Sequence, residues 1–336
     1  MKLVYIFRAK DKAYSIERVF KPIMNILDKR NDITVKQSNA EVRGGFFSTH
    51  FANIKKYSAL SRSGCICHIT CEVRYCAIFM RRSRTILTTH DVMSIINSSA
   101  PWYSRLYSYI FQFYIPLRYL KYLTCVSEST KNELVKLFPW VENKLRVINN
   151  PVDSDFKFSK KEFNTELPTI LHIGTKHNKN LLRVIKALKG INCHLRIIGK
   201  LSETQLAELH QSNIQFSNVY NISDEQIVSE YEKCDILSFP SLFEGFGMPI
   251  VEAQAVGRPV LTSNREPMAY VAGTGAVLVD PDDVAQIRNG FLLLINDANV
   301  REKCILNGLE NVKKYRVETV TEQYLELYNE LEINLP

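Results

Sequence analysis

The sequence predicts an α/β protein of two Rossmann-like, doubly wound domains with a helical C-terminal tail. Short apolar segments alternate with helix-length segments, and this alternation stops at a proline-containing break and then restarts. The stretch 282–331 has an almost wholly helical pattern. Ligands of such sheets bind at the carboxyl ends of the strands, so we expect the site in a cleft between the two domains.

The first half carries the first run of alternating strands and helices. Strands are expected at 3–7, 33–36, 65–69, 85–89, 122–126 and 145–148. Helices are expected near 16–29, 45–61, 73–81, 101–119 and 128–137. Ser127 to Glu133 offers cap-type residues at the start of the last of these helices.

Pro151 marks the predicted domain boundary, because its ring fixes its own backbone angle and biases Asn150 away from helix. The domains are therefore predicted to span 1–150 and 151–315. The second domain is expected to hold strands near 169–173, 194–198, 214–219, 235–239, 259–262 and 276–279, and helices near 179–189, 203–210, 223–233, 249–256 and 265–271. A C-terminal helix over 316–336 is expected to pack back towards the N-terminal domain.

Charge is unevenly spread over the 336 residues, whose formal net charge is +8. Residues 1–150 contain 24 Lys and Arg against 10 Asp and Glu, whereas the remainder contains 19 against 25. This asymmetry points to a polyanionic partner for the first half, such as nucleic acid, anionic lipid or a phosphate-bearing substrate. The alternative is a solvated basic face with no such partner.

The N-terminal run from Lys2 to Phe7 is too short for a signal-peptide core or a membrane span, and it is interpreted as a buried strand. We therefore expect a cytoplasmic protein with reduced thiols. The cluster of Cys65, Cys67, Cys71 and Cys76 does not have zinc-ligand spacing. Core packing of these cysteines is the favoured interpretation, and no metal site is expected.

Residues 102–122 are crowded with aromatic side chains. Arg105, Pro116 and Arg118 argue against a membrane-spanning helix. Two interpretations remain open: contact with a membrane interface, or burial against the sheet. Arg81, Arg82 and Arg84 would add attraction to anionic lipid.

The strongest functional signal is the segment 238–253, SFPSLFEGFGMPIVEA. An apolar strand is followed by a loop with Gly245 and Gly247 and by a helix that begins near Pro249. Backbone N–H groups at such a helix start receive anions. The glycines allow a ligand to approach the backbone closely.

Glu244 on this loop and Glu252, expected in the first helical turn, can both face one pocket. A carboxylate can accept two hydroxyl donors at once, which suits a hydroxyl-rich ligand. The alternative is that Glu252 only provides a favourable charge at a helix N-terminus.

Glu244 through Glu252 resembles the E-x7-E motif of the retaining GT-B glycosyltransferases of family four. The resemblance extends over CDILSFPSLFEGFGMPIVEAQAVGRPVLTS, ILHIGTKHNKNLLRVIKAL, LRIIGK, VINNPVD and CVSESTKNEL, and thus covers most of residues 85–330. It implies a GT-B fold in which residues 1–150 bind an acceptor and residues 151–315 bind a nucleotide sugar. The first 80 residues match only loosely.

The resemblance implies roles for particular residues. Glu252 would bind the nucleotide ribose, and Glu244 would lie by the donor sugar. Lys179 would neutralise the donor pyrophosphate. The remaining residues expected to line the donor site are Gly174, Thr175, Asn180, Tyr220, Ile222, Gly245, Phe246, Gly247 and Met248.

The sequence departs from the family pattern in several places. Many members have an arginine where Thr175 stands, so either Lys176 partly replaces that charge or one phosphate contact is missing. The family's N-terminal glycine-rich loop is absent after the first strand, where the sequence is FRAKDKAYSIE. Glu72 stands where related bacterial enzymes have an aspartate.

His90 and Asp91 follow the predicted strand 85–89 at its ligand-binding end. By resemblance, His90 lies beside the donor sugar and is a third catalytic residue with Glu244 and Lys179. His90, Asp91 and Glu72 are the predicted acceptor-binding residues. A structural histidine is the alternative for His90.

The expected activity is transfer of a hexosyl unit from a nucleotide sugar, with a slight preference for mannose from GDP-mannose. The acceptor is expected to be a lipid-linked or oligosaccharide molecule in surface polysaccharide (O-antigen or capsule) assembly, at the cytoplasmic face of the inner membrane. No cofactor, no metal and no nucleic-acid partner are expected, and no Asp-x-Asp motif occurs. The alternatives are a nucleotide-sugar epimerase of similar fold, or a non-enzymatic basic protein that binds membrane or nucleic acid.

Overall fold

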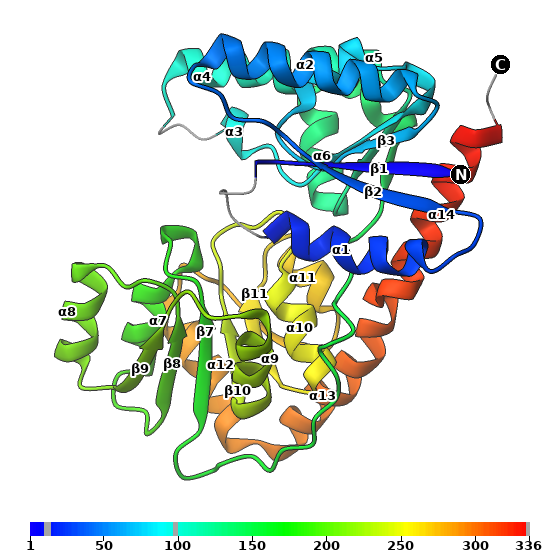
Figure 1. Cartoon of the computed structure of the whole chain (residues 1–336). Coiled ribbons are helices and arrows are strands. Elements are labelled where there is room, and N and C mark those ends of the chain that lie inside the picture. The colour runs from blue at the N-terminus through cyan, green and yellow to red at the C-terminus, as the bar shows by residue number, and fades with distance from the viewer. Residues whose placement is uncertain (10–14, 97–99, 334–336) are drawn as a thin grey trace. The chain divides into compact units, whose positions relative to one another are not determined.

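The computed structural model describes residues 1–9, 15–96 and 100–333. It divides into two compact units, Met1–Pro151 with Val317–Pro336, and Val152–Arg316. Each unit holds one six-stranded sheet in which all the described strand pairs are parallel (Figure 1). This is the two-sheet α/β fold that the alternating pattern predicts. Residues 10–14, within the segment that replaces the glycine-rich loop, and 334–336 of the predicted last helix lie outside the described residues.

The sheet of the N-terminal unit has the order β2-β1-β3-β4-β5-β6. Its strands are β1 (Lys2–Phe7), β2 (Thr34–Asn39), β3 (Ile66–Ile69), β4 (Thr85–Thr89), β5 (Tyr122–Cys125) and β6 (Leu145–Val147). All six lie where the sequence predicts them. Every residue of β3 and β4 is buried, as expected for central strands covered on both faces.

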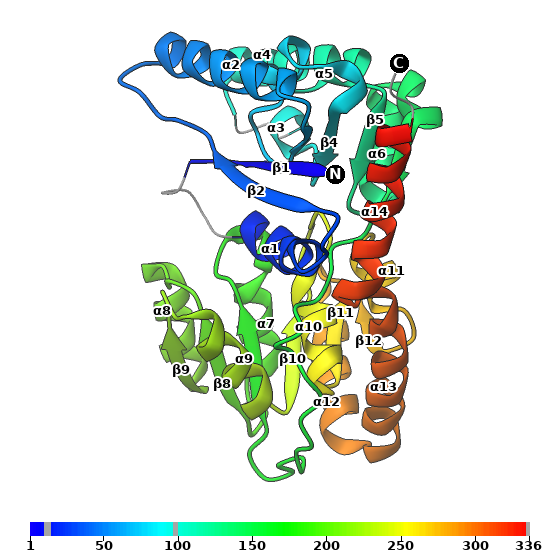
Figure 2. The ribbon, with the colours of Figure 1, turned by 45° about the vertical axis from the view of Figure 1, so that its right-hand side comes forward.

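Helices cover both faces of this sheet. They are α1 (Ser15–Asp28), α2 (Phe46–Arg62), α3 (Met93–Ile96), α4 (Trp102–Tyr107), α5 (Ile115–Tyr119), α6 (Glu128–Leu137) and α14 (Val317–Ile333). The views agree that α2, α4 and α5 lie side by side on one side of the sheet, whereas α1 and α14 lie on the other (Figure 2). Short 3-10 turns connect these elements at η1 (Arg74–Phe79), η2 (Arg82–Arg84) and η4 (Pro139–Lys144).

Two predicted helices of this unit differ from expectation. The stretch 73–81 forms only the 3-10 turn η1. The stretch 101–119 is divided into α4, the π-helical segment η3 (Ser108–Tyr114) and α5. Pro116, near the start of α5, has no N–H to donate and its ring crowds the preceding turn, which accounts for the change of helix type before it.

The helix α14 is held to the N-terminal sheet by a buried polar chain. The hydroxyl groups of Tyr5 and Tyr328 lie 2.7 Å apart. The ring of His68 bonds the Tyr328 hydroxyl through Nδ1 at 2.7 Å and Thr88 Oγ1 through Nε2 at 2.6 Å. All four residues are at most 1% exposed, so the pairing spares each the cost of an unsatisfied buried polar group.

The sheet of the second unit has the order β12-β11-β10-β7-β8-β9, of which Figure 1 shows β10, β7, β8 and β9 side by side. Its strands are β7 (Thr169–Ile173), β8 (His194–Ile198), β9 (Gln215–Val219), β10 (Ile236–Phe239), β11 (Val260–Ser263) and β12 (Ala276–Val279). Its α-helices are α7 (Leu181–Leu188), α8 (Glu203–Ser212), α9 (Asp224–Lys233), α10 (Met248–Val256), α11 (Met268–Ala272), α12 (Val284–Asn296) and α13 (Ala298–Asn311); two 3-10 turns, η5 (His177–Lys179) and η6 (Val312–Tyr315), complete the unit. Here too the predicted strands are confirmed.

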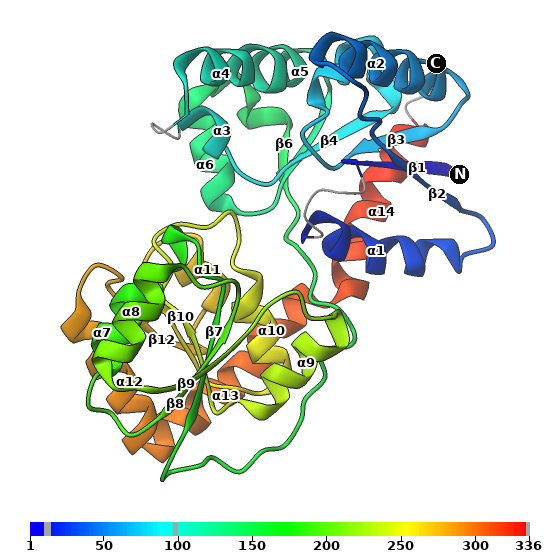
Figure 3. The ribbon, with the colours of Figure 1, turned by 60° about the vertical axis from the view of Figure 1, so that its left-hand side comes forward.

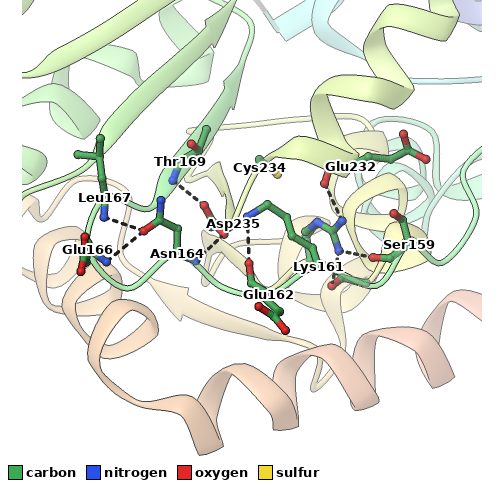
Figure 4. A network of polar contacts seen from close by, with 12 residues as sticks. Ser159, Lys161, Glu162, Asn164, Glu166, Leu167, Thr169, Glu232, Cys234 and Asp235 are labelled. Carbon is green, nitrogen blue, oxygen red and sulfur yellow. Dashed lines mark hydrogen bonds and ion pairs between the residues drawn. The ribbon is translucent and has the colours of Figure 1, made fainter.

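A polar network anchors the chain that leads into β7 (Figure 4). The carboxylate of Asp235, just before β10, accepts from the backbone N–H groups of Asn164 at 3.1 Å and Thr169 at 2.8 Å, and it is ion-paired with Lys161. Asp235 is 3% exposed, and these charge-assisted contacts compensate for its burial. The network therefore fixes the starts of β7 and β10, the two central strands that lead to the candidate site.

Arg258 completes this region by donating to backbone carbonyls of two other segments, the chain at Ser159 and the end of α9. It is 4% exposed and bonds Ser159 O at 2.8 Å, Tyr231 O at 3.1 Å and Glu232 O at 2.7 Å. Burial lowers the pKa of the Arg258 guanidinium from its ordinary value.

We predict that Arg258→Met lowers the free energy of unfolding by about 2–4 kcal/mol, because it leaves buried carbonyls unpaired. Urea unfolding followed by circular dichroism measures this change. Lys303→Met removes an exposed cation from the same unit and should stay within about 0.5 kcal/mol of the parent. Equal midpoints for the two variants would contradict the role given to Arg258.

Three of the four clustered cysteines pack in the core as predicted. Cys67, Cys71 and Cys76 are buried in the core of the N-terminal unit, and Cys65 is partly exposed. Within the described ranges, no group of three or more His, Cys, Asp or Glu side chains is arranged to hold a metal ion. Over the same ranges, no helix combines the length and apolar character that crossing a bilayer requires.

Candidate functional site

The loop after β10 opens α10 at a glycine. Gly247 is the N-cap residue, with φ of +113°, and it has no side chain to cap the first N–H groups of the helix. A Cβ at Gly247 would lie 3.1 Å from Ile250 Cδ1, so glycine suits both the backbone conformation and the close packing. The start of α10 is therefore a site where an anion can be received, as the sequence predicts.

Lys179 and Glu244 meet at this loop. The Lys179 ammonium lies 2.7 Å from Glu244 Oε1, and both side chains are largely buried, at 20% and 15% exposure. The amide of Asn178 donates to the same carboxylate oxygen at 3.3 Å and to the carbonyl of Phe243 at 3.2 Å. The ammonium also lies 4.6 Å from the ring centroid of Phe239, a cation–π contact.

Gly174 makes room for Lys179. It follows β7 with φ of +91°, and a Cβ there would lie 2.8 Å from the Lys179 side chain. The stem of the lysine therefore lies directly over the backbone of Gly174, which directs the ammonium towards Glu244. A residue other than glycine would displace it.

The side chains of Thr175 and Asn180 hold loops together. Thr175 Oγ1 donates to the carbonyl of Lys200 at 2.6 Å. Asn180 is 4% exposed, and its amide donates to the carbonyls of Pro240 at 3.0 Å and Pro281 at 2.6 Å. Asn180 is also the N-cap residue of α7, and its φ of +64° is not helical, so that helix begins two residues later than predicted. Both residues therefore position the loop that carries Lys179.

Tyr220 and Ile222 follow the edge strand β9. Tyr220 is 56% exposed and Ile222 is partly exposed. Between them Asn221 has φ of +56°, which turns the chain into α9. An exposed tyrosine at a strand's carboxyl end is available to a planar base, and its contact with the nucleotide stays a prediction.

Phe246 and Met248 complete the predicted donor set with Gly245. The Phe246 ring is 4% exposed and packs edge-on against Tyr315 at 5.6 Å, so only its backbone is available to a ligand. Met248 is the first residue of α10, so its N–H lies at the helix start. These positions agree with contacts made through loop amides.

Glu252 lies just beyond the first turn of α10. The helix begins at Met248, one residue earlier than predicted, so Glu252 is its fifth residue and the predicted first-turn position is wrong by one residue. The Tyr231 hydroxyl donates to Glu252 Oε2 at 2.5 Å, and Glu252 is 5% exposed. The carboxylate is thus oriented by Tyr231 from α9, which argues against the alternative of a simple favourable charge at a helix end.

His90 directly follows β4, and its side chain is held by the loop that follows β3. Its Nε2 bonds the carbonyl of Thr70 at 3.1 Å. Because a carbonyl can only accept, Nε2 carries the proton and Nδ1 of the neutral ring keeps its lone pair. Burial and the nearby Arg74 cation lower the pKa of His90 to about 4. At neutral pH the ring is therefore uncharged, and its Nδ1 can accept a hydrogen bond from a hydroxyl.

Asp91 and Glu72 stand at the same edge of the N-terminal sheet. Asp91 Oδ1 accepts from the N–H of Met93 at 3.0 Å, which caps α3. Glu72 is 65% exposed and lies 3.6 Å from Arg8 Nη1. The three predicted acceptor-binding residues thus follow the neighbouring strands β3 and β4, as the fold rule requires.

Several residues at these sites carry no sequence signal of their own. Asn178 and Tyr231 orient Glu244 and Glu252, and no motif singles them out. Arg74 is 7% exposed and forms no ion pair among the described residues; its guanidinium lies 4.3 Å from the ring centroid of Phe113. Tyrosines and arginines of this kind are distinguished only by their tertiary contacts.

Acid is expected to destabilise the protein through its buried histidines. Burial lowers the pKa of His68 and of His172 to about 3, and the pKa of His90 is about 4, against an ordinary value of 6.5. Between about pH 6.5 and pH 4 the unfolded chain binds protons that the folded chain does not, so stability is full above pH 6.5 and falls as the pH drops. Thermal unfolding from pH 8 to pH 4 measures this, and His68→Gln should flatten the dependence. A melting temperature that rises on acidification would contradict it.

Two units, each with a six-stranded parallel sheet flanked by helices, are the architecture of the GT-B fold. Residues 153–311 match the family described as "Glycosyl transferases group 1", and residues 66–156 match "Glycosyltransferase Family 4". The chain belongs to the GT-B glycosyltransferases of family four.

Relatives and solved structures agree with this assignment. The chain is 26% identical over 232 residues to "O-antigen chain mannosyltransferase B" of Escherichia coli, covering 62% of this chain and 60% of that protein. It is 28% identical over 216 residues to "O-antigen chain mannosyltransferase RfbU" of Salmonella typhimurium, covering 60% and 58%. The matched part thus spans about 60% of the length of these relatives. Sucrose-phosphate synthase from Thermosynechococcus elongatus has the same fold, with a TM-score of 0.81, 14% identity and full coverage of both chains.

Proposed function

We propose that this chain is a retaining glycosyltransferase that moves a hexosyl unit from a nucleotide sugar to a lipid-linked or oligosaccharide acceptor. The observation that carries the proposal is the 2.7 Å contact between Lys179 and Glu244 beside the uncapped start of α10. It places a cation and a helix N-terminus together, which suits a diphosphate, and a carboxylate next to them, which suits sugar hydroxyls. The family match favours this function over an epimerase or a nucleic-acid-binding protein.

The donor we propose is a nucleoside diphosphate sugar, with a slight preference for GDP-mannose. The printed names of two relatives, both O-antigen mannosyltransferases, support mannose and a role in surface polysaccharide assembly. Breaking the glycosyl–phosphate bond builds negative charge on the leaving diphosphate. Lys179 and the N–H groups of α10 would stabilise that charge, so the proposal includes neither a resident metal nor a cofactor.

The proposed reaction retains configuration at the sugar carbon, as the family resemblance implies. The leaving diphosphate and the attacking hydroxyl are then on the same face of the sugar, and Glu244 is not required as a covalent nucleophile. Its engagement with Lys179 and Asn178 suits a positioning role towards sugar hydroxyls. Glu252, held by Tyr231, would accept the ribose hydroxyls.

The acceptor is assigned to the N-terminal unit. His90, neutral and with a free acceptor at Nδ1, would bind a hydroxyl of the transferred sugar or of the acceptor. The carboxylates of Asp91 and Glu72 would accept hydrogen bonds from further hydroxyls of the acceptor. A lipid-linked acceptor places the protein at the cytoplasmic face of the inner membrane, and nucleic acid has no part in this proposal.

The experiment that tests the function is a donor panel in the presence of EDTA. UDP-, GDP-, ADP- and CMP-sugars are incubated with the protein and membrane extracts, and release of nucleotide and the product's anomeric configuration are measured. The expected result is nucleoside diphosphate release with one donor and an α-linked product from an α-linked donor. Product formed from the donor alone by epimerisation, or no binding of any nucleotide in a thermal-shift screen, would overturn the proposal.

A further inference from the structure

We infer that the N-terminal unit docks on an anionic lipid bilayer through the outer surface of α2 and α4–η3. We call this surface the aromatic face and define it by Phe46, Phe47, Phe51, Trp102, Tyr103, Leu106 and Phe111. It deepens the proposed function, because it rests on a lipid-linked acceptor and names the surface by which the protein would reach it.

The large apolar side chains of the aromatic face are mostly exposed to solvent, so they contribute little to the core. Phe47 is 84% exposed, Trp102 is 73% exposed and Phe51 is 71% exposed. Isolated exposed apolar residues are normal on protein surfaces, but large aromatic side chains gathered on one face mark an interaction site. Trp, Tyr and Phe are the residues favoured at the boundary between lipid head groups and hydrocarbon.

The two helical segments form one continuous surface. The rings of Phe46 on α2 and Tyr107 on α4 have centroids 5.4 Å apart, and His50 Nε2 lies 2.6 Å from the Tyr107 hydroxyl. Tyr107 in turn stacks on Phe111 at 5.4 Å. These contacts agree with the side-by-side position of α2, α4 and α5 in all views (Figures 1, 2 and 3).

Charge decides which partner fits this surface. The segments that carry this surface, 46–62 and 102–119, contain five Lys and Arg residues and no Asp or Glu. Lys55 on α2 and Arg118 on α5 are exposed. An anionic bilayer supplies the opposite charge to the cations while its interior receives the aromatic rings.

A second copy of the chain fits less well. In a two-fold dimer built on this surface, the same patch would meet itself, so cations would face cations with no acidic residue of α2 or of Trp102–Tyr119 to pair with them. A bilayer has no such conflict. The helices also suit a position in the plane of the membrane, since basic residues and apolar rings occur along the same short segments.

The test is co-sedimentation of the full chain with vesicles, either of equal parts phosphatidylglycerol and phosphatidylcholine or of phosphatidylcholine alone. We expect binding to the anionic vesicles, weakened by salt, and little binding to the neutral ones. Phe47→Ser combined with Phe51→Ser should lower the partition coefficient by at least about tenfold. Lys55→Glu should weaken binding at low salt. The matched control is Leu306→Ser, at an exposed apolar position of the second unit that should bind as the parent does.

Three results would overturn the inference: no vesicle binding by the parent, equal binding to both vesicle types, or unchanged binding by the double variant. A concentration-dependent dimer in light scattering that the double variant abolishes would also overturn it, in favour of a copy-to-copy interface. Melting temperature and nucleotide binding of the same samples show that the variants are folded. Loss of vesicle binding with donor binding intact separates this inference from the donor chemistry of the proposed function.

Discussion

Lys179→Ala is expected to lower the rate of sugar transfer by about 10³-fold. The ammonium is the one side-chain cation in contact with Glu244 in the described donor loop, and it is largely buried, so its charge acts with little screening by water. Removing it takes away the group that would stabilise the leaving diphosphate, and it also leaves a largely buried carboxylate without its ion partner. Single-turnover release of nucleoside diphosphate measures the loss directly.

Lys176→Ala is the matched control for this prediction. Lys176 stands three residues earlier in the same loop, and its side chain is exposed. The two variants therefore change the net charge equally but alter different local contacts. A loss of less than about threefold is expected for Lys176→Ala. Equal losses in both variants would mean that the general charge of the loop, rather than the position of Lys179, supports the reaction, and would favour the compensation for Thr175 that the sequence suggests.

The strands were predictable because burial of a strand restricts which residue types occur along it, and this pattern is visible in a short stretch of sequence. β10, buried along its whole length, appears in the sequence as a short, mostly apolar run, and β4, equally buried, as a run rich in the strand-favouring residues Thr and Ile. Both Lys179 and Glu244 could be named as site residues from the motifs in which they stand. Their contact could not be read from the sequence directly, because they are 65 positions apart. Only the parallel order, which makes β7 and β10 neighbours, brings them together.

Other features could not be predicted from the apolar spacing. That spacing suggests one continuous helix over 101–119; Pro116 marks a disturbance in it, but the π-helical form of the segment before the proline is seen only in the structure. Phe46, Phe47 and Phe51 are the residues of an ordinary core helix by composition, and only the fold shows that they are exposed. Tyr231 is one of 16 tyrosines, and its contact with Glu252 emerges only when α9 packs on α10.

Glu252→Ala is expected to weaken nucleotide binding by roughly 10- to 100-fold, the loss that follows when a charged acceptor of ligand hydroxyls is removed. The carboxylate is 5% exposed and oriented by the Tyr231 hydroxyl, so it is held in one position and water screens its charge only weakly. Isothermal titration with the nucleoside diphosphate of the preferred donor measures the affinity. An unchanged affinity would contradict the assignment of Glu252 to the ribose.

Tyr231→Phe separates binding from positioning. It keeps the carboxylate and the buried ring but removes the hydroxyl that donates to Glu252 Oε2. If Glu252 binds the ribose and Tyr231 only orients it, this variant should weaken nucleotide binding by about threefold to tenfold, less than Glu252→Ala does. It should also raise KM more than it lowers kcat, because ribose contacts are made in the ground state and the transition state alike. If Tyr231→Phe instead weakens binding as much as Glu252→Ala, the tyrosine hydroxyl itself is part of the nucleotide site. The pair would then act as one unit, since removing either member costs the same.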